Sequence, residues 1–138
     1  MSLPNTPSFK AGGTIHVGHV VKLDATADNQ ILECSAATDT AIGIAKRSMR
    51  DTPGLTGSDN TVAANSGDSC EIYGPGAVAP AIAGAAVTRG AIVTSDATGA
   101  VIAAAGATTR PVGYALESAS GAGIEIQVLV NPWSATLP

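Results

Sequence analysis

Apolar and polar residues alternate along several short segments, most clearly over residues 123–130. The apolar side chains at every second position of this segment are Ile124, Ile126, Val128 and Val130. A period of two predicts a β-strand with one buried face, toward which these side chains point. A second strand of this kind is expected over residues 70–73, with Cys70 and Ile72 inward.

Other segments also have the composition of strands, namely 19–23, 30–34, 41–48, 91–95, 100–104 and 112–118. Turn residues separate them at intervals of roughly 8 to 12 residues, which is typical of a sandwich or barrel. Helices are disfavoured because Gly, Thr and Val are frequent throughout. The pattern therefore predicts an all-β fold.

The strand pattern occurs twice. Residues 11–26 match residues 83–98, and residues 31–45 match residues 101–115. A third block, Cys70-Glu71-Ile72, is aligned with Ile124-Glu125-Ile126. We therefore predict a small β-barrel or β-sandwich built from a duplicated unit, in one domain over residues 11–130. The copies are expected over about 11–73 and 83–130, with one shared core.

Several recurring residues are explained by this scaffold. Asp24 and Asp96 each begin an Asp-Ala-Thr triplet, in which the carboxylate is expected to fix a tight turn rather than to act in catalysis. Gly43 and Gly113 each interrupt a strand, which indicates a bulge or a close backbone approach. Neither pair points to an enzyme.

The sequence gives little reason to assign a disulfide to the cysteines or a metal site to the histidines. Cys34 and Cys70 align with Ala104 and Ile124 in the other copy, so both are expected to be free thiols in the core. His16 and His19 are three residues apart, and on an extended strand they converge only if Gly18 breaks it. Without a third ligand they are expected to be solvent or interface histidines, so no metal or cofactor is predicted.

Segments that the copies do not share are the best candidates for specialised contacts. They are an N-terminal arm over residues 1–10, a long surface loop over residues 49–65 and a C-terminal tail over residues 131–138. A basic cluster at the start of this loop consists of Lys46, Arg47 and Arg50. It is expected either to protect an edge strand or to contact an acidic partner. The expected capsid or subunit contacts are Phe9, Lys46, Arg47, Arg50 and Trp133.

Composition favours a protein that is partly covered by other chains. Only 13% of the 138 residues are charged, against about 25% in a typical soluble domain. The net charge of -4 gives no reason to expect nucleic acid. No segment has the pattern of a membrane span or a targeting signal, so synthesis in a cytoplasm is expected.

Five motifs carry a resemblance to a known family. They are GDSCEI (67–72), AGAAVTRG (83–90), DATG (96–99), VGYAL (112–116) and GIEIQV (123–128). Over about residues 11–130 the chain resembles the capsid-cement, or head decoration, proteins of tailed bacteriophages. The resemblance implies a structural protein that binds the outside of the mature head and reinforces contacts between major capsid protein subunits, often as a trimer. It implies no catalytic or cofactor-binding residues.

Two hypotheses of different classes follow. The first is a structural virion protein on the outer capsid surface, made in the host cytoplasm, which stabilises the capsid by bridging major capsid protein subunits. It would act as a homo-oligomer, with a trimer favoured. The alternative is a carbohydrate-binding or adhesive module of a phage tail or fibre. We expect neither to be an enzyme.

Overall fold

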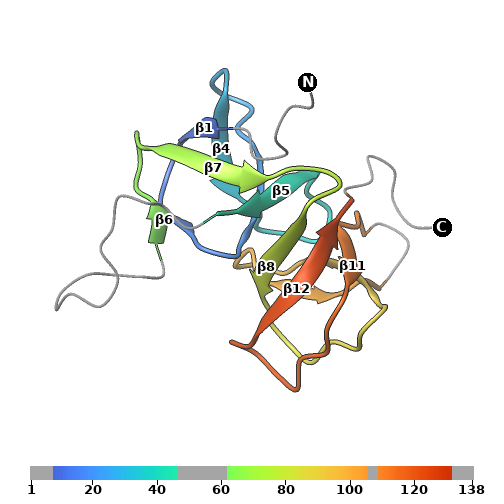
Figure 1. The fold of residues 1–138 in the computed structure, drawn as a ribbon. Coiled ribbons are helices and arrows are strands. Elements are labelled where there is room, and N and C mark those ends of the chain that lie inside the picture. The colour runs from blue at the N-terminus through green and yellow to red at the C-terminus, as the bar shows by residue number, and fades with distance from the viewer. Residues whose placement is uncertain (1–7, 47–61, 106–108, 132–138) are drawn as a thin grey trace, which may run out of the picture.

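The computed structural model describes residues 8–46, 62–105 and 109–131, and these residues form twelve β-strands without a helix. The predicted all-β fold is confirmed. These residues therefore include no helical membrane span. The strands are arranged in two lobes that follow one another along the chain (Figure 1).

The first lobe is a closed barrel with strand order β1-β4-β3-β5-β7. Its strands are β1 (Ser8–Ala11), β3 (Val20–Leu23), β4 (Gln30–Glu33), β5 (Ala41–Ala45) and β7 (Ser69–Tyr73). Strand β1 closes the barrel, because it pairs antiparallel with β7 and parallel with β4. Strands β2 (Ile15–His16) and β6 (Val62–Ala64) form a small sheet beside it.

The second lobe is a five-stranded sheet with order β10-β9-β11-β12-β8. Its strands are β8 (Val78–Ile82), β9 (Ile92–Ser95), β10 (Val101–Ala103), β11 (Gly113–Ala115) and β12 (Glu125–Val130). Their order repeats that of the first lobe, since β3, β4 and β5 correspond to β9, β10 and β11. The duplication seen in the sequence is therefore a duplication of strands and of their pairing.

Strand β1 shows that the repeat begins earlier than expected. Ala11 pairs with Ile31 in the first lobe, and the aligned Ala83 forms an isolated bridge with Val101 in the second. Strand β1 thus corresponds to β8, and Ser8–Lys10 belongs to the barrel wall. The expectation of an N-terminal arm reaching residue 10 is wrong, because the backbone of these residues pairs with Ser69–Glu71 of β7.

The final strand of each copy is shifted by two residues from the sequence alignment. Ala45 and the aligned Ala115 pair with Ile72 and Val128, so these two residues are equivalent. Cys70 therefore corresponds to Ile126, not to Ile124. Ile124 is 37% exposed and precedes β12, so its predicted inward position is wrong. Ile126, Val128 and Val130 are buried, as predicted.

The interior consists of two apolar clusters rather than the single core expected. One fills the barrel and includes Ile15, Val21, Ile31 and Ile72. The other combines the second lobe with first-lobe residues, namely Val20, Cys34, Ala41 and Ile44. Adjacent side chains of a strand point to opposite faces, so Val20 and Val21 enter different clusters. The barrel wall thereby also serves as part of the second lobe's core.

The recurring turn and glycine residues have the predicted roles. The backbone N–H of Thr26 donates to Asp24 Oδ1 at 2.8 Å, and that of Thr98 donates to Asp96 Oδ1 at 2.7 Å. A Cβ atom at Gly43 would collide with a neighbouring strand's carbonyl oxygen, and one at Gly113 would do the same. The aspartates therefore fix turns and the glycines permit close strand contact.

Candidate functional site

Phe9 lies in the barrel wall, where it lines an open apolar groove of about 510 Å³. It is half-buried and packs against the barrel core. Leu23 also lines the groove, with 55% of its surface exposed. The other lining residues are Asn29, Ala41, Ile42, Ile72, Gly74 and Pro75. Phe9 is thus part of a surface hollow on the first lobe rather than of a free arm.

Lys46 directly follows β5 and does not line this groove. Its Nζ lies 3.3 Å from Glu71 Oε2 and 5.8 Å from the centre of the Tyr73 ring. Since β5 lies between β3 and β7, Lys46 does not protect an edge strand, which corrects one of the two interpretations. The other expected contacts, Arg47, Arg50 and Trp133, lie outside the described residues.

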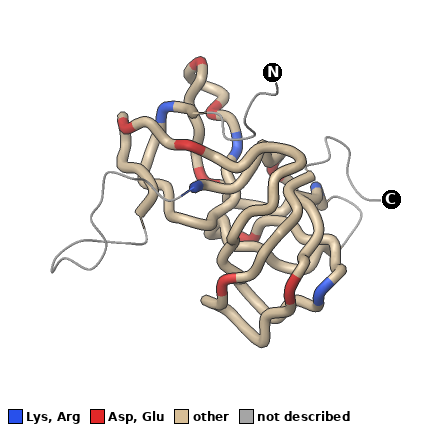
Figure 2. The backbone as a smooth tube through the Cα atoms, in the orientation of Figure 1, with Lys and Arg blue, Asp and Glu red and all other residues tan. Residues whose placement is uncertain are grey.

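Charged residues are spread singly along the described backbone, and long stretches of both lobes carry none (Figure 2). One ion pair joins Lys22 Nζ to Asp39 Oδ2 at 3.0 Å. Large apolar side chains are also exposed, among them Val78 and Leu116. A surface with so few charges loses little hydration when another chain covers it.

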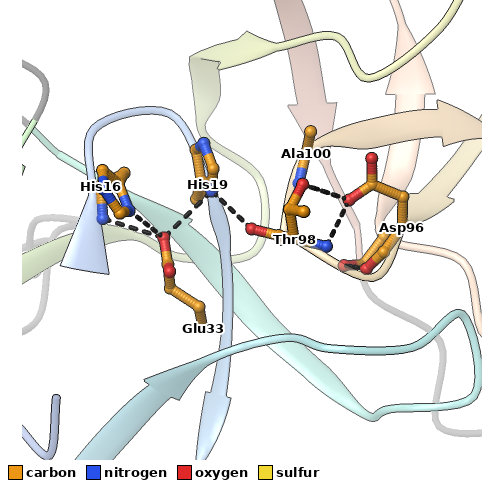
Figure 3. Close-up of polar contacts among 7 residues, drawn as sticks. His16, His19, Glu33, Asp96, Thr98 and Ala100 are labelled. Carbon is orange, nitrogen blue, oxygen red and sulfur yellow. Dashed lines mark hydrogen bonds and ion pairs between the residues drawn. The ribbon is translucent and has the colours of Figure 1, made fainter. Parts of the chain in front are cut away.

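The side chains of His16 and His19 lie close together, although residues three apart on a regular strand point to opposite faces. Gly18 has a φ of 79°, which turns the chain between the end of β2 and the start of β3. The two imidazole rings lie 5.2 Å apart, centre to centre. Glu33, at the end of β4, completes the group (Figure 3), which we call the His-Glu cluster (His16, His19 and Glu33).

One carboxylate oxygen holds the His-Glu cluster together. Glu33 Oε2 accepts a hydrogen bond from the His16 backbone N–H at 2.9 Å and lies 3.0 Å from Nδ1 of both rings. His19 Nδ1 also lies 2.8 Å from the carbonyl oxygen of Thr98, in the second lobe. The cluster therefore reaches the contact between the lobes.

Electrostatics in the cluster favour a charged carboxylate. Burial alone would lower the pKa of His19, but the hydrogen bond and negative charge of Glu33, with the Thr98 carbonyl, raise it above its usual value. Burial alone would raise the pKa of Glu33, but hydrogen bonds from His19 and His16 hold it below its usual value. The sequence interpretation missed Glu33, although a hairpin around Asp24 places it opposite Val21, close to His19.

Both cysteines are free and buried, as predicted. Cys34 lies in the cluster that the lobes share, and Cys70 lies in the barrel core. Burial raises the pKa of Cys34 to about 12 and that of Cys70 to about 11. Because the thiolate is the nucleophilic form, these thiols are suited to packing and not to catalysis.

Comparison with known proteins identifies the family. A family model described as XM1 gp53 minor capsid protein matches residues 5–128 of the 138. The chain belongs to this family. It is accordingly a structural protein of a phage virion. No curated protein matches the chain.

A solved structure has a similar fold. It is the head fiber gp8.5 N base of bacteriophage phi29, with a TM-score of 0.61 and 17% sequence identity. The match covers 96% of this chain and 97% of that chain. These comparisons support a phage structural protein, and the more specific resemblance to head decoration proteins stays a prediction.

Proposed function

We propose that the protein binds the outer surface of a phage head and stabilises the capsid by bridging neighbouring major capsid protein subunits. The observation that supports this role best is the apolar groove beside Phe9 in a member of a capsid protein family. In this proposal the groove receives an apolar side chain of the capsid surface. The protein acts as a homo-oligomer, with a trimer favoured.

The groove has the properties of an interface anchor. Leu23 at 55% exposure and the half-buried Phe9 offer apolar surface whose burial is favourable by about 25 cal/mol per Å². A central anchor of this kind commonly contributes at least about 2 kcal/mol to binding, which is some thirty-fold in affinity. Many copies on one head then reinforce the particle through multivalency.

A cosedimentation assay with heads that lack this protein tests the proposal. Leu23→Asp places a charge in the groove and is expected to weaken head binding at least about ten-fold. Leu116→Asp is the matched control, because Leu116 is 47% exposed on the second lobe and does not line the groove. It is expected to bind as the parent does.

Two results would contradict this proposal: no binding of the parent protein to heads, or equal binding by the two variants. Light scattering of the free protein measures its oligomeric state, and a monomeric mass would contradict the trimer. Melting temperatures of both variants show whether a loss of binding reflects loss of folding.

A second candidate is the base of a head fibre or another adhesive module. The likeness to the head fiber base, which extends over nearly the whole of both chains, favours it. In this case the second lobe or a partner fibre chain would point away from the capsid. A glycan-binding screen combined with electron microscopy of decorated heads separates the two roles, because only the adhesive module binds sugars or carries a projecting fibre.

A further inference from the structure

The donor atoms of His16, His19 and Glu33 all lie within 4.8 Å of one another. We propose that the His-Glu cluster binds one divalent transition-metal ion, with zinc as the best match. The ligands are one imidazole nitrogen of each histidine and a carboxylate oxygen of Glu33. Two imidazoles with a carboxylate suit zinc and its first-row neighbours, whereas magnesium and calcium prefer oxygen donors alone.

The spacing of the donor atoms fits a tetrahedral ion. Zinc binds histidine nitrogen and carboxylate oxygen at about 2.0 to 2.2 Å, so two ligands of one tetrahedral ion lie about 3.3 Å apart. Glu33 Oε2 already lies 3.0 Å from Nδ1 of both histidines. All the donor atoms lie within 4.8 Å of one another, so rotations of the side chains have at most about 1.5 Å to close around an ion.

The backbone prepares this geometry. Gly18, with its φ of 79°, brings His16 and His19 to the same side of the chain. The His16 backbone N–H donates to Glu33 Oε2 at 2.9 Å and orients the carboxylate. Support of this kind around the ligands increases metal affinity. Since β2 and β4 carry ligands 17 residues apart, a bound ion also stabilises the folded state.

The cluster is open enough to exchange an ion with solvent. The side chain of His16 is 40% exposed, and those of His19 and Glu33 are 17% and 20% exposed. Water can therefore enter and occupy the remaining coordination position. The Thr98 carbonyl oxygen and Glu33 Oε2 both face His19 Nδ1. An ion on Nδ1 takes the place of the hydrogen on this atom, so the neutral imidazole carries its proton on Nε2, and a histidinium releases its second proton to solvent.

Metal titration of the untagged, full-length protein tests the proposal. His16 and His19 are the only histidines in the chain, so no other imidazole pair competes. After dialysis against a chelator, calorimetric titration with zinc chloride is expected to show one ion per chain. Cobalt(II) is expected to give the visible absorption of a tetrahedral site. Saturating zinc should raise the melting temperature by several degrees.

Three variants assign the binding to the cluster. Glu33→Gln removes the negative charge of one ligand, and His16→Gln removes one ligand nitrogen. Each variant is expected to lower zinc affinity at least about ten-fold. Glu71→Gln is the control, because Glu71 is a half-exposed carboxylate of the same lobe, paired with Lys46. It should bind zinc as the parent does.

Absence of one-to-one zinc binding by the parent would overturn the proposal. Equal zinc affinity of Glu33→Gln and Glu71→Gln would also overturn it. Circular dichroism without metal checks that each variant is folded. If Glu33→Gln fails to fold, His16→Gln decides, since its side chain is the most exposed of the three.

Discussion

The two lobes repeat one five-stranded unit, yet the first closes into a barrel and the second stays open. In the first lobe, Lys10 and Ala11 of β1 pair with Gln30 and Ile31 of β4. The aligned strands of the second lobe, β8 and β10, leave only the bridge between Ala83 and Val101. One sequence pattern can thus form either a closed barrel or an open sheet.

The contact between the lobes explains why the second unit is open. In the barrel, the Lys10 N–H donates to the Asn29 carbonyl at 2.9 Å. The equivalent groups in the second lobe belong to Ile82 and Gly99, and both bond to the first lobe. Ile82 N–H donates to Gly18 at 3.1 Å, and the Gly99 carbonyl accepts from Val20 at 2.7 Å. Buried backbone groups require partners, and here the neighbouring lobe supplies them.

Deleting residues 1–10 should lower the stability of the closed first lobe more than any single substitution. The deletion removes Ser8–Lys10 of β1, and with it the pairing to β7 and Phe9's packing on the barrel core. We expect a loss of more than about 3 kcal/mol in the free energy of unfolding, as for other losses of a packed aromatic. Urea denaturation measures it.

A deletion of residues 1–7 is the control, because it leaves all of β1 in place. The same loss of stability in both deletions would show that the loss does not come from removing β1.

Glycine substitutions compare the two lobes at equivalent positions. A Cβ at Gly43 would meet the Tyr73 carbonyl oxygen, and one at Gly113 would meet that of Leu129. Gly43→Ala and Gly113→Ala should each cost about 1 to 3 kcal/mol, because the strands must separate to admit a methyl group. Thermal unfolding measures both effects.

Gly121→Ala serves as the matched control, since no atom beyond its chain neighbours lies within 4 Å of the added Cβ. It should change stability by less than about 0.5 kcal/mol. If all three variants had the same melting temperature, close approach of the strands would not explain why glycine is needed at Gly43 and Gly113.

Thiol labelling is expected to show the smallest effect. It compares the reactivity of Cys70 in the barrel core with that of Cys34 in the cluster that the lobes share. Both thiols are buried and have a raised pKa, about 12 for Cys34 and about 11 for Cys70. Neither should react appreciably with iodoacetamide at neutral pH in the folded protein. In the variant lacking residues 1–10, Cys70 should react before Cys34, because Phe9 pairs with Cys70. Mass spectrometry measures each site, and rapid labelling of the intact protein would contradict the burial.

Much of the fold could be predicted because local chemistry determines it. The Asp-Ala-Thr turns depend on bonds between residues two apart, such as Asp24 and Thr26. The buried side of β12 follows from its period of two, and Ile126 and Val128 are buried accordingly. The candidate site was harder to predict from the sequence. Of the expected contacts, only Phe9 and Lys46 lie in the described residues, and neither is one of the three residues of the His-Glu cluster.

By itself, the sequence determined the duplicated β unit, its turns and the burial of both cysteines, because each depends on side chains near in the chain or on their polarity. Only the tertiary structure decided the register of the last strands, the place of β1 in the barrel and the meeting of Glu33 with His16 and His19. These depend on backbone pairing between distant segments. Such pairing leaves little trace in residue type, because nearly every residue carries the same N–H and C=O groups.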